Sequence, residues 1–122
     1  MVDDEHEMRY LTSAFLSHAF PSLDVKEASD GRAALALLAK TRFDVIVSDY
    51  RMPGMDGFAF LAKAAAYLPM SDCILMTAYA DKELQERAKA AGMQFIDKGG
   101  DPNSVVEAVE QVLRRRRPVA TE

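Results

Sequence analysis

Cysteine is nearly absent from this sequence, and long apolar runs are absent altogether. The single cysteine, Cys73, lies inside the apolar run 73–76. This excludes a disulfide framework within the chain and favours a buried structural thiol over a reactive one. No apolar run approaches the roughly 20 residues of a membrane span, and the acidic start differs from a secretory signal. These absences predict a cytoplasmic domain that does not enter a membrane.

A strong excess of charge of either sign is also missing. The net charge of −4 argues against a general nucleic-acid binder. The four arginines at 114–117 could contact nucleic acid, but basic side chains at the end of a helix also complement its dipole. We therefore interpret this run as a solvated tail or linker. Neither G-x-x-x-x-G-K nor G-x-G-x-x-G occurs, so the sequence offers no glycine loop of those types for phosphate.

The hydrophobic pattern alternates between helix and strand along the chain. With 122 residues, 49% of them hydrophobic, the chain can bury one core and form a single domain. The pattern predicts strands at 25–28, 43–48, 73–76 and 93–96. It predicts helices at 5–20, 32–40, 58–68 and 81–91, and a last helix for which Asp101 and Pro102 serve as N-cap and first residue. Regular alternation of this kind predicts a parallel sheet with helices on both faces.

The first expected strand is unusually short. Only Met1 and Val2 precede the acidic pair Asp3-Asp4, whereas strands typically have five or six residues. Two explanations stay open: residues upstream of Met1 complete the strand, or the strand is truncated and the sheet is weaker there.

Polar residues follow four of the expected strands at their carboxyl ends. These residues are Asp3 and Asp4 after the first strand, Asp49 after the third, Thr77 after the fourth and Lys98 after the fifth. In open α/β sheets, ligands bind outside the carboxyl ends of the strands. Each residue alone has an ordinary structural interpretation, but their joint occurrence in this order predicts one site at one edge of the sheet.

The sequence resembles the receiver domain of two-component response regulators over nearly its whole length. The matching residues are the run 2–5, Asp49 with the turn 52–57, Thr77-Ala78, and Lys98. The resemblance implies a doubly wound, flavodoxin-like α/β fold with a five-stranded parallel sheet in the order 2-1-3-4-5, flanked by five helices. The domain would span 1–117, and 118–122 would be a tail or the start of a linker.

The resemblance also implies a chemistry for these residues. Asp49 would accept a phosphoryl group from a histidine kinase or phosphotransfer protein. Asp4 and Asp49 would ligate Mg²⁺ directly, Asp3 through water, and the backbone carbonyl of Arg51 would add another oxygen. Lys98 would neutralise charge on the transferred group. Such a module catalyses only its own phosphorylation and dephosphorylation and is otherwise not an enzyme.

Elementary electrostatics supports a cation among these acids independently of the resemblance. Carboxylates about 4 Å apart repel by about 4 kcal/mol per pair at an effective dielectric of 20, so the group should titrate as a coupled set. A hard divalent cation relieves this repulsion, and Mg²⁺ favours one or two carboxylates together with water and phosphate oxygens.

A switch is the second implication of the resemblance. The Thr77 hydroxyl would donate to the phosphoryl group, and Phe95 would turn inward as Thr77 moves. This would alter the face formed by the fourth helix, the fifth strand and the fifth helix, where an output domain, a downstream protein or a second copy of the chain would bind. A plain core phenylalanine is the alternative for Phe95. Direct contact with nucleic acid or membrane is not expected.

The sequence departs from the family at one place near Lys98, and two other functions stay open as alternatives. Gly99-Gly100 stands where the family usually has proline, which predicts a more mobile placement of Lys98. A degenerate receiver that is never phosphorylated is one alternative. A Mg²⁺-dependent phosphatase with an aspartyl-phosphate intermediate is the other. The sequence disfavours it, because Asp49-Tyr50-Arg51 has no second acid two residues after the nucleophile.

Overall fold

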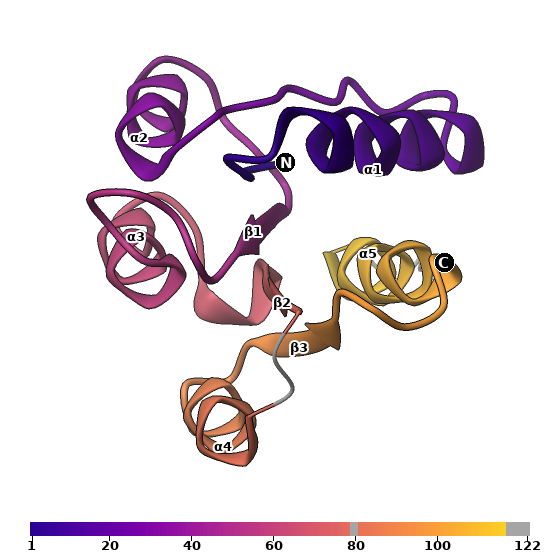
Figure 1. Cartoon of the computed structure of the whole chain (residues 1–122). Coiled ribbons are helices and arrows are strands. Elements are labelled where there is room, and N and C mark those ends of the chain that lie inside the picture. Colours follow the sequence, from indigo (N-terminus) through magenta and orange to yellow (C-terminus); the bar gives the residue numbers. More distant parts are fainter. Residues whose placement is uncertain (79–80, 117–122) are drawn as a thin grey trace.

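The computed structural model of the protein describes residues 1–78 and 81–116. The predicted tail at 118–122 lies outside the described residues. From α2 onward helices and strands alternate along the chain, whereas between α1 and α2 the predicted strand at 25–28 contributes only an isolated bridge at Ala28 (Figure 1). In chain order the elements are α1 His6–Ala19, α2 Gly31–Lys40, β1 Ile46–Asp49, α3 Gly57–Ala64, the 3-10 turn η1 Met70–Asp72, β2 Cys73–Thr77, α4 Lys82–Ala90, β3 Gln94–Asp97 and α5 Asn103–Arg116.

The strands form a parallel sheet in the order β1-β2-β3. The register places Asp49 beside Met76 and Thr77 beside Asp97, so the carboxyl ends of all three strands reach one edge. Because parallel strands share one direction, polar residues at these ends meet at that edge.

Val2 extends the sheet beyond β1 through two isolated bridges, one to Ser48 and one to Ala28. The Val2 N–H donates to the Val47 carbonyl at 2.8 Å, and the Asp49 N–H donates to the Val2 carbonyl at 2.9 Å. On the other side, the Asp3 N–H donates to the Ala28 carbonyl at 3.1 Å. These pairings place 25–28 and the chain start in the predicted order 2-1-3-4-5, so the fold class is confirmed.

The first and second of the five expected strands, which are neighbours at one side of the sheet, are present as bridges and not as full strands in the described chain. The segment beside β1 consists of Met1, Val2 and Asp3, so only Val2 has neighbours on both sides along the sheet. Because Val2 is the one residue of this segment that pairs in a bridge on each side, the pairing is an isolated bridge and not a ladder of several residues. This is the short first strand that the sequence predicts.

Two apolar layers cover the faces of the sheet. Helices α1 and α5 lie on one side, and α2 and α3 lie on the other, with α4 beside β3 (Figure 1). Alternate residues of the strands point into the two layers: Ile46 and Leu75 face the α2–α3 side, whereas Val47 and Ile74 face the α1–α5 side. This alternation explains why the strands are apolar throughout, as strands covered on both faces are.

Aspartates set the starts of most helices. The side chains of Asp30, Asp56 and Asp81 accept hydrogen bonds from backbone N–H groups in the first turns of α2, α3 and α4, which satisfies donors that a helix start leaves free. Asp101 accepts likewise from the N–H of Asn103 at 2.9 Å, in agreement with the predicted cap. Helix α3 ends at Ala64, four residues before the predicted end. None of the described helices has the length and apolar content needed to cross a membrane.

Candidate functional site

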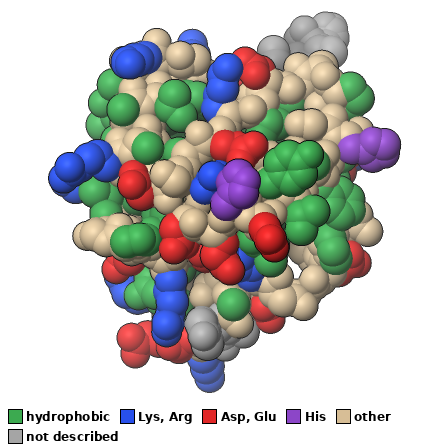
Figure 2. All heavy atoms as spheres, turned by 45° about the horizontal axis from the view of Figure 1, so that its top comes forward, with side chains coloured by type: hydrophobic (Ala, Val, Ile, Leu, Met, Phe, Trp, Pro, Cys, Tyr) green, Lys and Arg blue, Asp and Glu red, His purple; other side chains and the backbone are tan. Residues whose placement is uncertain are grey.

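The predicted site residues gather at the carboxyl edge of the sheet. Asp49 and Thr77 are the last residues of β1 and β2, and Lys98 directly follows β3. Asp3 follows the bridging Val2. A space-filling view of this side shows acidic side chains grouped near the start of α1, with apolar side chains beside them (Figure 2).

The Lys98 ammonium lies at the centre of this group. Its Nζ lies 2.8 Å from Asp3 Oδ2, 3.0 Å from Glu5 Oε1 and 3.1 Å from Asp49 Oδ2. The contacts with Glu5 and Asp49 are also hydrogen bonds. The Lys98 N–H donates to the Thr77 carbonyl at 2.7 Å, which fixes the backbone from which the side chain reaches the acids.

Three carboxylates converge beside this ammonium. One oxygen each from Asp3, Asp4 and Asp49 lies within 4.8 Å of the others. Asp3 and Asp49 are buried, and Asp4 is exposed. Asp3 Oδ2 is buried and, apart from its ion pair with Lys98, has no hydrogen-bond partner among the described residues. This buried oxygen therefore depends on an ammonium that it shares with Glu5 and Asp49.

Burial and neighbouring charge displace the pKa values of the central pair. Burial raises the pKa of Asp49 to about 6, and repulsion by Asp3 adds to this, although attraction by Lys98 opposes it. For Lys98, burial alone would lower the pKa, but Asp3, Glu5 and Asp49 together raise it above its usual value. The ammonium therefore stays charged, while part of the acidic charge remains uncompensated.

The donor set fits Mg²⁺. Hard oxygen ligands, one or two carboxylates that bind the ion directly and an exposed side suitable for water are the features that Mg²⁺ sites use in proteins. Asp3, Glu5 and Asp49 share the single positive charge of Lys98, and the raised pKa of Asp49 indicates negative charge in excess of what Lys98 neutralises. We conclude that Asp3, Asp4 and Asp49 suit a divalent cation.

The turn after Asp49 is held against the end of β1 by glycine. The Gly57 N–H donates to the Tyr50 carbonyl at 2.7 Å. A Cβ on Gly57 would lie 2.6 Å from the carbonyl oxygen of Asp49 and 2.9 Å from the Cα of Tyr50, closer than backbone atoms tolerate. Gly54 has a φ of 81°, a conformation that favours glycine. The turn therefore returns closely to the strand end, and it carries the exposed Arg51 whose carbonyl was predicted as a ligand.

Thr77 and Phe95, the predicted switch residues, lie on neighbouring strands. Thr77 is buried at the end of β2. Phe95 lies beside Leu75 in the register and is half-buried, in contact with the apolar layer on the α2–α3 side. This position agrees with either a switching ring or a core ring, so the switch stays a prediction.

The Gly99-Gly100 pair is held by Asp97. The Asp97 carboxylate accepts from the Gly99 N–H at 2.9 Å, and its carbonyl accepts from the Gly100 N–H at 3.1 Å. Neither glycine adopts a positive φ, and an added Cβ would make ordinary contacts at both positions. Proline at 99 would remove the N–H that bonds to Asp97. The turn that carries Lys98 is thus fixed by hydrogen bonds where the family uses proline.

Sequence reasoning missed two residues of the site. Glu5 contacts Lys98, whereas the sequence placed Glu5 in the matching run 2–5 without predicting a role for it. Arg9 donates from Nη1 to the Asp3 carbonyl at 2.8 Å and pairs with Glu27 at 3.1 Å through Nε. No local pattern signals these contacts, because Glu5 and Arg9 stand four positions apart and yet pair with Lys98 and Glu27 and not with each other.

The arginine run makes contacts within the chain. Arg114 pairs with Glu110 at 3.3 Å, and Arg115 donates to the Ser71 carbonyl at 2.6 Å. Arg114 and Arg115 therefore belong to helix α5 and make contacts within the chain, so this part of the run is not the tail or linker that the sequence suggested. Arg117 lies outside the described residues.

Comparison with known proteins shows the family of the chain. The family profile described as "Response regulator receiver domain" matches residues 1–110. The chain belongs to this family. The DNA-binding transcriptional regulator NtrC of Salmonella typhimurium is 34% identical over 114 residues, which cover 93% of this chain and 24% of NtrC. This receiver domain thus spans about a quarter of that relative.

Solved receiver domains have the same fold. The chemotaxis response regulator CheY4 of Vibrio cholerae is 32% identical, with a TM-score of 0.75 over 91% of this chain and 93% of CheY4. The response regulator TrrA of Thermotoga maritima, solved in complex with Mg²⁺ and BeF, is 23% identical, with a TM-score of 0.78 over 91% of this chain and 94% of TrrA. The second likeness concerns the fold alone.

Proposed function

We propose that this receiver domain is a phosphoacceptor signalling module in which Asp49 receives a phosphoryl group from a histidine kinase or phosphotransfer protein. The observation that carries the proposal is the contact of Lys98 Nζ with Asp3 and Asp49 at 2.8 and 3.1 Å, beside the oxygens of Asp4. Three separate strand ends deliver these groups, so the fold builds a charged centre where an acyl phosphate can form and be neutralised.

The reaction is an in-line displacement at phosphorus. An ionised oxygen of Asp49 attacks the phosphorus, a new P–O bond forms, and the bond from phosphorus to the donor nitrogen breaks, with its electron pair leaving on the donor histidine. Lys98 donates to an oxygen of the transferred group and offsets its charge. Because burial and Asp3 raise the pKa of Asp49 to about 6, the nucleophile is ionised at neutral pH but is a stronger base than an exposed aspartate.

The residues that would hold Mg²⁺ are Asp4 and Asp49, with Asp3 acting through water and the Arg51 carbonyl adding an oxygen. When bound, Mg²⁺ supplies positive charge that offsets the charge on the phosphoryl oxygens. The sharing of one ammonium by three carboxylates supports this choice of ion.

The output of the module would be a protein contact. Donation from the Thr77 hydroxyl to the phosphoryl group and inward rotation of Phe95 would alter the face of α4, β3 and α5. That face would bind an output domain, a downstream protein or a second copy of the chain. The length of NtrC beyond the matched quarter agrees with an attached output domain. A cytoplasmic location, where a kinase can reach Asp49, belongs to the same proposal.

Incubation with a small phosphodonor and Mg²⁺, followed by intact mass measurement, tests the proposal. We expect an adduct of one phosphoryl group that is lost in Asp49→Asn and when EDTA removes the metal. Failure of the wild-type protein to form the adduct would favour a degenerate receiver. Steady turnover of external phosphoesters would instead indicate a phosphatase.

A further inference from the structure

The Lys98 ammonium has no hydrogen left for a phosphoryl group in the structure. A lysine ammonium carries three N–H donors and no acceptor. Three carboxylate oxygens lie within 3.1 Å of Nζ, one each from Asp3, Glu5 and Asp49. The side chain of Lys98 is only 6% exposed, so its position is set by these contacts. For Lys98 to bind a phosphoryl oxygen, one of the carboxylates must release it.

The three contacts differ in how easily they break. The Asp3 side chain is fully buried and that of Asp49 is 7% exposed, whereas the Glu5 side chain is 66% exposed. A released Glu5 carboxylate is hydrated at once, while a released Asp3 carboxylate stays buried without a cation. Asp49 is itself the residue that carries the phosphoryl group. Glu5 is therefore the contact that yields at least cost.

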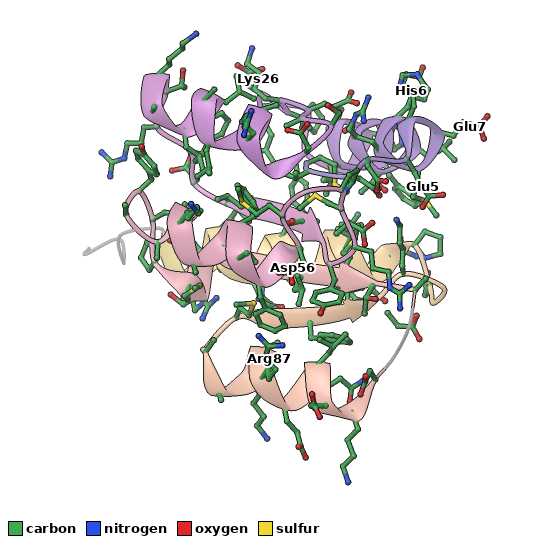
Figure 3. The ribbon with its side chains drawn as sticks, turned by 60° about the vertical axis from the view of Figure 1, so that its left-hand side comes forward. Glu5, His6, Glu7, Lys26, Asp56 and Arg87 are labelled. Atoms are coloured by element: carbon green, nitrogen blue, oxygen red, sulfur yellow. The ribbon has the colours of Figure 1, made fainter. Side chains whose placement is uncertain are left out.

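The backbone of Glu5 is fixed while its carboxylate is free to turn. Its N–H donates to Asp3 Oδ1 at 3.0 Å, which ties the start of α1 to the site. Glu5 occupies the N-cap position of α1, but its side chain makes no capping hydrogen bond within the described chain. Figure 3 shows Glu5 on the side of α1 that faces the strand ends, whereas His6 and Glu7 lie on its outer side. Rotation about side-chain bonds thus suffices to release Lys98.

We infer that Glu5 is a displaceable partner of Lys98, a positioning residue that holds the ammonium beside Asp49 before phosphorylation and yields it to the phosphoryl group afterwards. This inference rests on the proposed function. Glu5 would therefore weaken phosphoryl binding, because the Glu5–Lys98 ion pair must break whenever Lys98 engages the phosphoryl group. Removing the Glu5 charge removes that weakening.

The test compares Glu5→Gln with the matched control Glu7→Gln. Both residues are acidic and lie at the start of α1, so both changes remove the same charge from the same helix end. With Mg²⁺ at saturation, the probe is beryllofluoride, a phosphoryl analogue, with binding followed by calorimetry. An exposed ion pair of this kind predicts about two- to fivefold tighter binding in Glu5→Gln and no change in Glu7→Gln. Glu5→Asp, which keeps the charge but shortens the side chain, should also bind more tightly than the wild type.

A second measurement needs neither metal nor phosphoryl group. Hydrogen exchange of the Lys98 ammonium, followed by nitrogen NMR, should be faster in metal-free Glu5→Gln than in the wild type, because one of its three acceptors is weakened. Glu7→Gln should leave that exchange unchanged. A general effect on the helix dipole would change both variants alike.

The outcomes separate this inference from the proposed function. Beryllofluoride binding that is equal in the wild type and Glu5→Gln, or weaker in the variant, would overturn the role of Glu5 and leave the phosphoacceptor intact. A wild-type protein that binds no beryllofluoride and forms no adduct would overturn both.

Discussion

Replacing Asp49 with asparagine is expected to stabilise the metal-free protein above about pH 6, although it removes the proposed nucleophile. Burial of the Asp49 carboxyl group, with repulsion by Asp3, raises its pKa from the ordinary value of 3.8 to about 6 in spite of Lys98. A raised pKa means that the folded protein holds the ionised carboxylate less favourably than the unfolded chain does. Asparagine has nearly the same shape without the charge.

The size of the effect follows from the two pKa values. Below pH 3.8 the carboxyl group is neutral in both states, so the substitution should change the free energy of unfolding little. Between 3.8 and about 6 only the unfolded chain ionises, so the wild type loses stability relative to Asp49→Asn as the pH rises. Above that window the difference is constant, and the pKa displacement corresponds to about 3 kcal/mol in favour of the variant.

Urea unfolding measures the difference in the free energy of unfolding between the wild type and Asp49→Asn. We follow it by far-ultraviolet circular dichroism, because the chain has no tryptophan for a fluorescence signal. Both proteins are compared at about pH 4 and about pH 8 in EDTA. The control is Asp24→Asn, which removes an exposed carboxylate that lies 3.6 Å from Lys26. We expect the control to stay within about 0.5 kcal/mol of the wild type at both pH values.

Addition of Mg²⁺ should reverse the order of stability. Mg²⁺ binds the folded wild type through its acids and stabilises it by mass action, whereas the variant lacks one of the ligands. A less stable Asp49→Asn in EDTA at about pH 8 would refute the reasoning, because it would show that attraction by Lys98 outweighs burial and repulsion by Asp3.

Three further predictions concern the packing of Gly57, the hydrogen bond of Arg9 and the reactivity of Cys73. Gly57→Ala should destabilise the fold by about 1–3 kcal/mol in urea unfolding, because the new Cβ meets backbone at the end of β1, whereas Gly100→Ala should change little. Arg9→Met should lower the free energy of unfolding by about 1–3 kcal/mol, because it removes the donor to the Asp3 carbonyl. Arg114→Met removes an exposed ion pair with Glu110 and should lower it by less than about 1 kcal/mol. Burial, with a nearby acid, raises the pKa of Cys73 to about 12, so its thiol should react with a disulfide reagent only after unfolding. Equal destabilisation by either matched pair, or rapid labelling of native protein, would contradict these expectations.

Much of the fold was predictable because this sequence is locally consistent. Apolar strands end on polar residues, and aspartates begin the helices, so periodicity places Asp49, Thr77 and Lys98 at one sheet edge. The end of α3 was placed too late, because Ala65 and Ala66 have high helix propensity and nothing local marks the turn that begins there. Propensity alone does not reveal where tertiary packing ends a helix.

The contacts of long side chains were not predictable. Glu5 and Lys98 are 93 positions apart in the chain, and no local pattern fixes which acid an ammonium reaches. The hydrogen bonds of Asp97 to Gly99 and Gly100 were also not predicted. An acid two residues before glycine is a turn signal, and in this turn its hydrogen bonds restrict the backbone freedom that glycine would otherwise allow.

Site mapping of the phosphorylated protein tests the central claim most directly. Borohydride reduces an aspartyl phosphate to homoserine, and trypsin then releases the peptide 43–51, which holds two aspartates, Asp44 and Asp49. After treatment with a small phosphodonor and Mg²⁺, we predict homoserine at position 49 alone. Homoserine at 44 or at either acid of the chain start, or its absence from a protein that has gained a phosphoryl group, would contradict the assignment of Asp49 as the acceptor.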